Sequence, residues 1–114
     1  MNNLVDLSNY RQKGSKHRAV FFSKEELRSI LDLYSRHVAD GEWKDYAIDH
    51  QGPVAGFSVF RHSFDRPLLT IGKRRNGKHE EFFLTSNGRT IKRSRHLGDL
   101  LKYLSKPMKL IKLP

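Results

Sequence analysis

Apolar side chains between residues 23 and 40 recur with the period of an α-helix. Ser23 and Glu26 stand three positions apart at the start of this segment and can form a capping box, in which each side chain bonds the backbone N–H of the other residue. Gly41 can adopt the left-handed conformation that ends many helices. We therefore predict a helix over residues 23–40. The apolar stripe expected to face the core consists of Leu27, Ile30, Leu31, Tyr34 and Val38.

After this helix the apolar spacing changes to about two residues, which is typical of strands. Five short runs follow, and residues that favour turns close each of them. Two of the separators are Asn-Gly pairs, Asn76-Gly77 and Asn87-Gly88, which tolerate the positive φ of tight hairpins. The connections are too short for crossover helices, so we expect an antiparallel meander. The predicted strands are Trp43–His50, Val54–His62, Leu68–Arg74, His79–Thr85 and Arg89–Arg93.

A second helix is predicted after the last strand. Ser94 can cap it, and it should end before Pro107 because the residue preceding a proline avoids the helical region. The order α-β-β-β-β-β-α predicts an α+β fold, a mostly antiparallel meander sheet with both helices on one face. The apolar stripe of the second helix consists of Leu97, Leu100, Leu101 and Leu104.

The two ends of the chain differ from the segment between them. Residues 1–19 show no apolar period, and we interpret them as a flexible basic arm. Residues 20–105 are predicted to form a single α+β domain, since 114 residues of which 37% are hydrophobic can build one core. Residues 106–114 are basic and partly apolar, and we expect them to form a tail.

Composition excludes several classes of protein. The chain contains no cysteine, which excludes disulfides, zinc ribbons, thiol nucleophiles and iron–sulfur clusters. No apolar run is long enough to span a membrane, and the first residues lack the basic and apolar regions of a secretory signal. We therefore expect a cytoplasmic protein without a membrane span.

The positive charge is concentrated near the end of the sequence. The net charge is +10, yet residues 21–50 hold four Lys and Arg against seven Asp and Glu. Residues 87–114 hold eight Lys and Arg against a single Asp. This asymmetry indicates a surface that faces a polyanion.

The meander predicts where the cations meet. The strands 68–74 and 89–93 end at the same edge of the sheet, because the strand between them runs the other way. The start of the second helix lies beside them, and its free N–H groups favour an anion. We interpret this edge as a surface that binds the phosphates of RNA or DNA with little sequence preference. The predicted phosphate-binding residues are Lys73, Arg74, Arg75, Lys78, Arg89, Lys92, Arg93 and Arg95.

Trp43 and Tyr46 fall on opposite faces of their predicted strand. At most one of them is therefore a core residue, and the other can act as a stacking platform for nucleic-acid bases. We favour Trp43 as the core residue, packed under the end of the first helix.

The sequence offers little support for catalysis. Asp45 and Asp49 are four positions apart on a strand, roughly 13 Å, which is too far to share a proton or a metal ion. The six histidines lack the spacing of metal ligands, so we expect no metal and no cofactor, and enzymatic activity stays open. The alternative function is a protein interaction or assembly module, in which the acidic first helix or an open sheet edge docks a protein partner. The oligomeric state is not predicted.

Several segments resemble a family of small alphaproteobacterial proteins catalogued as a domain of unknown function. The most specific of them is residues 41–49, Gly-Glu-Trp-Lys-Asp-Tyr-Ala-Ile-Asp. The resemblance covers roughly residues 22–104 and implies a small bacterial cytoplasmic domain. The family carries no assigned activity, cofactor or catalytic residue, so the resemblance transfers no site. Further similar segments are residues 27–34, 57–61, 66–68 and 91–93.

Overall fold

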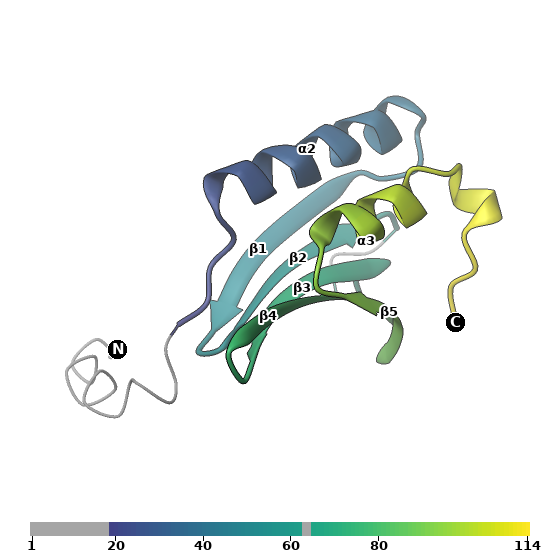
Figure 1. Cartoon of the computed structure of the whole chain (residues 1–114). Helices are drawn as coiled ribbons and strands as arrows, with labels where there is room; N and C mark the ends of the chain where they lie inside the picture. Colours follow the sequence, from purple (N-terminus) through teal and green to yellow (C-terminus); the bar gives the residue numbers. More distant parts are fainter. Residues whose placement is uncertain (1–18, 63–64) are drawn as a thin grey trace.

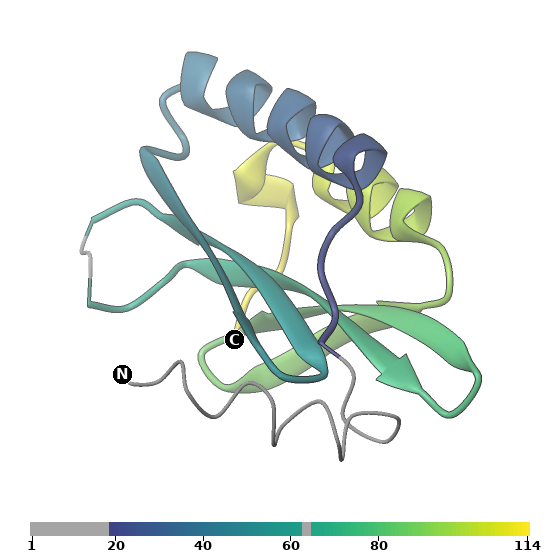
Figure 2. The same cartoon turned by 90° about the vertical axis from the view of Figure 1, so that its left-hand side faces the viewer.

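The computed structural model describes residues 19–62 and 65–114, which form one antiparallel sheet whose strands lie side by side in sequence order. The helices lie over the same face of this sheet (Figure 1 and Figure 2). The predicted α+β meander with two α-helices on one face is thus confirmed. Residues 1–18 of the predicted arm lie outside the described residues. The elements are α2 (Lys24–Ala39), β1 (Asp45–Gln51), β2 (Val54–Phe60), β3 (Leu69–Asn76), β4 (His79–Ser86), β5 (Arg89–Ser94), α3 (Leu97–Leu104) and the 3-10 helix η1 (Met108–Leu110).

The start of α2 follows the predicted local chemistry. The Glu26 N–H donates to Ser23 Oγ at 3.0 Å, and the Ser23 N–H donates to Glu26 Oε1 at 2.7 Å, so the capping box is complete. Glu25 and Glu26 in the first turn also interact favourably with the positive end of the helix dipole. Among the described residues, no helix has the length and the hydropathy needed to cross a membrane.

The buried side of α2 differs from the predicted stripe. Ile30, Leu33 and His37 are buried, whereas Val38 is 38% exposed. The helix carries two neighbouring apolar strips, and both have the helical period. Contact with α3 decides which one is buried, since His37 Nε2 lies 2.6 Å from the backbone oxygen of Leu104. The other strip, half-buried except for Val38, consists of Leu27, Leu31, Tyr34 and Val38.

Local chemistry also shapes the hairpins, although some boundaries differ from the predicted ones. The two Asn-Gly turns contain positive φ angles, 68° at Gly77, 53° at Asn87 and 78° at Gly88. β1 begins at Asp45 rather than at residue 43, and β5 continues to residue 94. Ser94 is therefore not the N-cap of α3, which is His96.

The core lies between the sheet and the two α-helices. Phe57, Ile71 and Leu84 are opposite one another on three neighbouring strands, and all are fully buried. They face the helices, as do the residues two positions away on the same strands. The largest fully buried side chain is Trp43, which lies before β1 rather than in it.

The segment after α3 packs into this core. Met108 and Ile111 are 9% and 6% exposed and join the core cluster. The Met108 N–H donates to Glu42 Oε2 at 3.0 Å. Two apolar side chains three positions apart are too few to show the period of a helix or a strand. The sequence pattern therefore predicts a tail here, whereas the structure buries both side chains.

Gly72 has a close neighbour on the face of the sheet opposite the helices. It pairs with Phe83, and a Cβ atom at this position would clash with the Phe83 ring. We expect Gly72→Ala to lower the free energy of unfolding by about 1–3 kcal/mol, because the ring must move. Gly98→Ala is the matched control, since a Cβ there meets nothing within 4 Å and alanine favours the α3 helix. Urea unfolding of both variants tests this prediction. A Gly72→Ala variant as stable as the wild-type chain would contradict it.

Candidate functional site

The strand register brings the predicted cationic segments to one end of the sheet. Lys73 on β3 is opposite Phe82 on β4, which in turn is opposite Ser94 on β5. The last residues of β3, the β3–β4 turn and the residues after β5 are therefore neighbours. The side chains of these segments nevertheless have different surroundings.

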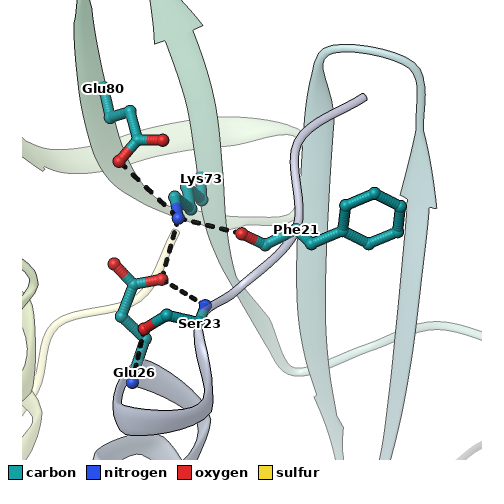
Figure 3. Close-up of polar contacts among 5 residues, drawn as sticks. All are labelled: Phe21, Ser23, Glu26, Lys73 and Glu80. Carbon is teal, nitrogen blue, oxygen red and sulfur yellow. Dashed lines mark hydrogen bonds and ion pairs between the residues drawn. The ribbon is translucent and has the colours of Figure 1, made fainter. Parts of the chain in front are cut away.

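Lys73 is part of the folded core rather than of the surface. It is 5% exposed, and its Nζ donates to Phe21 O at 2.8 Å and to Glu26 Oε1 at 2.9 Å (Figure 3). Glu80 Oε1 lies 3.6 Å from the same ammonium. The prediction that Lys73 contacts phosphate is thus corrected, because its charge is already balanced inside the protein. The parity of Leu69, Ile71 and Lys73 on β3 places all three on the helix-facing side, and this signal was present in the sequence.

Arg74 is also paired within the chain. Its Nε and Nη2 donate to Glu81 Oε1 at 2.9 and 2.8 Å, across the β3–β4 ladder. Its guanidinium carbon lies 4.6 Å from the centre of the Phe83 ring. Arg74 therefore offers a phosphate less net charge than an unpaired arginine would.

At this end of the sheet, four predicted cations are exposed without an ion pair to any described residue. Within residues 19–62 and 65–114, the structure gives no ion pair to Arg75, Lys78, Arg93 or Arg95. Lys92 is half-buried beside them, with its Nζ 5.8 Å from the Tyr103 ring centre. We call this set the basic rim: Arg75, Lys78, Lys92, Arg93 and Arg95.

Sequence reasoning missed a further cation near the rim. Lys106 Nζ lies 5.0 Å from the centre of the Tyr103 ring, the ring that Lys92 also approaches. Lys106 and Lys92 are distant in the sequence, so the sequence does not indicate that both approach the Tyr103 ring. They do so because α3 packs beside β5.

Arg89 belongs to the opposite end of the sheet. It is opposite Ser86 at the β4–β5 turn, while Arg93 stands four residues farther along β5, roughly 13 Å away. The β2–β3 connection at that end supplies other cations, Arg61 and Arg66. They line a cavity of about 350 Å³ together with His62, Pro67, Leu68, Ser86, Asn87 and Pro114.

The start of α3 holds a carboxylate of the chain itself. Ser94 Oγ accepts from the His96 N–H at 3.0 Å and donates to Asp99 Oδ2 at 2.5 Å. Asp99 stands in the first turn, where the helix dipole favours a negative charge. A carboxylate of the chain thus already lies at the helix start where the sequence predicted an external anion.

The two aromatic candidates have separate roles. Trp43 is 1% exposed and stacks on the His37 ring with 4.2 Å between centroids, which confirms it as a core residue and corrects its candidacy for base stacking. Tyr46 is 44% exposed, but one face of its ring stacks on Phe57 at 4.9 Å. Tyr34 packs edge-on against Tyr46, and burial raises the pKa of the Tyr34 hydroxyl, which donates to Lys44 O.

A buried ionic contact at the other end of α2 was not predicted. His37 is 4% exposed, with Nδ1 2.6 Å from Glu42 Oε1 and Nε2 2.6 Å from Leu104 O. The Glu42 carboxylate and the Leu104 carbonyl are both acceptors, so both contacts are hydrogen bonds when each ring nitrogen of His37 carries a hydrogen. The hydrogen bond from His37, together with that from the Met108 N–H, lowers the pKa of Glu42. The contact joins α2, α3 and the segment that follows α3.

This contact is structural rather than catalytic. Both ring nitrogens of His37 are engaged within the protein, which leaves neither free to move a proton to or from a substrate. Among the described residues, no three His, Asp or Glu side chains gather as they would around a metal ion. Asp45 and Asp49 lie on β1, on the face opposite the helices.

Comparison with known proteins agrees with the resemblance seen in the sequence. A family model described as "Protein of unknown function (DUF2794)" matches residues 20–101, a range that includes α2, the whole sheet and the basic rim. No curated protein and no solved structure was found to match. Because the matched range covers most of its length, the chain belongs to this family of unknown function, DUF2794.

Proposed function

We propose that this chain is a cytoplasmic protein that binds the phosphate backbone of RNA or DNA through the basic rim. The observation that carries the proposal is the exposure of Arg75, Lys78, Arg93 and Arg95 at one end of the sheet without an ion pair to any described residue. A cation that no carboxylate of its own protein neutralises keeps its full charge for a phosphate. The net charge of +10 adds a long-range attraction for polyanions.

The layout of the basic rim suits a polymer better than a small anion. Its cations project from a hairpin turn and from the end of β5, and β3 and β5 are two strands apart, roughly 10 Å. A single phosphate cannot reach across that distance, whereas successive phosphates of a nucleic-acid strand can. Contacts of this kind position the backbone and carry little sequence information.

The test is fluorescence anisotropy with labelled single-stranded and double-stranded RNA and DNA at about 50 and 200 mM salt. If all five rim cations contact phosphates, the logarithm of the binding constant should fall with the logarithm of the salt concentration with a slope of about −3.5 to −4.5. The affinity should therefore fall roughly 100- to 500-fold over this range. Arg93→Glu/Arg95→Glu should weaken binding by about tenfold or more and reduce the slope by about 2.

The matched control places the same charge change at the other end of the sheet. Arg61→Glu/Arg66→Glu alters the net charge equally, but these residues line the cavity at the β2–β3 connection. The control should bind much more tightly than the rim variant. Equal losses in both variants would show that net charge alone matters. Failure of the wild-type chain to bind any of the four nucleic acids at the lower salt would overturn the proposal.

A further inference from the structure

Within residues 19–62 and 65–114, no strand pairs with the outer edge of β1. β1 comes first in the sheet order and lies at one edge of the sheet (Figure 1). It pairs with β2 along one continuous register of seven residues, and all seven are exposed. The outward backbone N–H and C=O groups of such a strand are a template for another strand. Proteins often protect such edges with lysine or proline, but the sequence of β1, Asp-Tyr-Ala-Ile-Asp-His-Gln, contains neither.

Exposed apolar side chains gather at this edge. Among the described residues five large hydrophobic side chains are exposed, and three of them are on or beside β1. Tyr46 is 44% and Ile48 45% exposed, both on the helix-facing side of the strand. Phe21 is 54% exposed and packs its ring edge-on against His50 at 4.2 Å.

The half-buried strip of α2 continues this apolar surface. Tyr34 belongs to the strip, and its contacts with the Tyr46 ring and the Lys44 oxygen place it above β1. The buried strip of α2 faces α3 instead, as the contact of His37 with Leu104 shows. The rest of the half-buried strip follows Tyr34 along the same side of the helix. These residues are Leu27, Leu31 and Val38.

We infer that β1 pairs with β1 of a second copy of this chain, antiparallel and about a two-fold axis at Ile48. That register pairs the whole strand, with Ile48 opposite Ile48, Tyr46 opposite His50 and Asp45 opposite Gln51 of the other copy. A perpendicular two-fold axis keeps the helices of both copies on the same face of a continuous sheet. The two half-buried α2 strips then meet across the seam and cover one another.

Charge selects the register of this pairing. Moving the axis to residue 47 would place Asp45 opposite Asp49, and moving it to residue 49 would place Asp49 opposite itself. Like charges directly opposite destabilise a pair of strands, and the register centred on Ile48 avoids them. The surface lies in residues 21–50, outside the segments that hold most of the excess positive charge, so this pairing does not require those cationic segments of the two copies to meet.

Oligomeric state is the first test. Sedimentation velocity of the wild-type chain at micromolar concentrations should show a species of twice the chain mass. Ile48→Lys should give the single-chain mass, because it places two ammonium groups opposite each other at the axis. Leu110→Lys is the matched control: Leu110 is 60% exposed in η1, outside both β1 and α2, so this variant should remain a dimer. A monomeric wild type, or a dimer that survives Ile48→Lys, would overturn the inference.

Cysteine cross-linking tests the register, since the natural chain has no cysteine. Directly opposed residues of antiparallel strands have Cα atoms about 4.5–5.5 Å apart, which a disulfide can bridge. Ile48→Cys should therefore form a disulfide-linked dimer with itself under mild oxidation. Tyr46→Cys and His50→Cys should each stay monomeric under denaturing conditions when alone but cross-link when mixed. Self-linkage of Tyr46→Cys without that of Ile48→Cys would overturn the register.

Discussion

Replacing His37 with leucine is expected to lower the free energy of unfolding by about 2–4 kcal/mol at neutral pH. The His37 ring bonds Glu42 on one side and Leu104 O on the other, and a leucine side chain bonds neither. Loss of one partner from a buried ionic contact usually costs more than the contact contributes, because the other partner stays buried. The Glu42 side chain is 20% exposed, so water reaches it and moderates the loss.

The same contact makes stability depend on pH. Hydrogen bonds from His37 and Met108 N–H hold the pKa of Glu42 below its ordinary value of 4.5 in the folded chain. The stabilisation that ionised Glu42 provides is therefore fully present above pH 4.5 and is lost as the pH falls through the lowered folded-state pKa. We expect the stability difference between the wild-type chain and His37→Leu to shrink over that acidic range.

Urea unfolding of both proteins at neutral and acidic pH measures the two effects together. His79→Leu is the matched control, because His79 is exposed at the start of β4 and should change stability by no more than about 0.5 kcal/mol. If His37→Leu is as stable as the wild-type chain at neutral pH, the packing of leucine offsets the loss of the contact. The prediction that this contact stabilises the fold would then be wrong.

Local chemistry explains why most of the fold was predictable. The Ser23 and Glu26 cap and the two Asn-Gly turns depend on residues a few positions apart, and each is found where it was expected. The strand order follows from short connections, because neighbouring strands joined by tight turns must pair in sequence order. The side of α2 that is buried was not predictable in this way. His37 and Val38 both continue an apolar strip of the helix, and a contact with Leu104, 67 residues after His37, selects the former.

The candidate site shows the same division between local and distant information. Topology alone places the cations of the β3–β4 turn and of β5 at one end of the sheet. The pairing of Arg74 with Glu81 also follows from the hairpin, once residues 76 and 79 are set opposite each other at the turn. The partner of Lys73 is different, since Glu26 is 47 residues away and belongs to α2. A count of basic residues cannot separate a cation that is neutralised inside the protein from one that faces solvent.

Replacing Lys73 with methionine should therefore affect stability and not phosphate binding. Methionine preserves the length and most of the packing of the side chain but removes the ammonium that joins Phe21 O, Glu26 and Glu80. We expect the free energy of unfolding to fall by about 2–3 kcal/mol, since the Lys73 side chain is 7% exposed and its partners would lose their donor. The start of α2 and the segment before it would lose their link to β3.

Lys78→Met is the matched comparison, five residues farther along the same hairpin. Lys78 is exposed and has no ion pair with any described residue, so this variant should keep its stability within about 0.5 kcal/mol. Its affinity for nucleic acid at low salt should fall, and the salt slope should decrease by about 1. Lys73→Met, measured where it is still folded, should bind like the wild-type chain. Weakened binding by folded Lys73→Met would mean that the buried ammonium reaches phosphate after all, as the sequence analysis predicted.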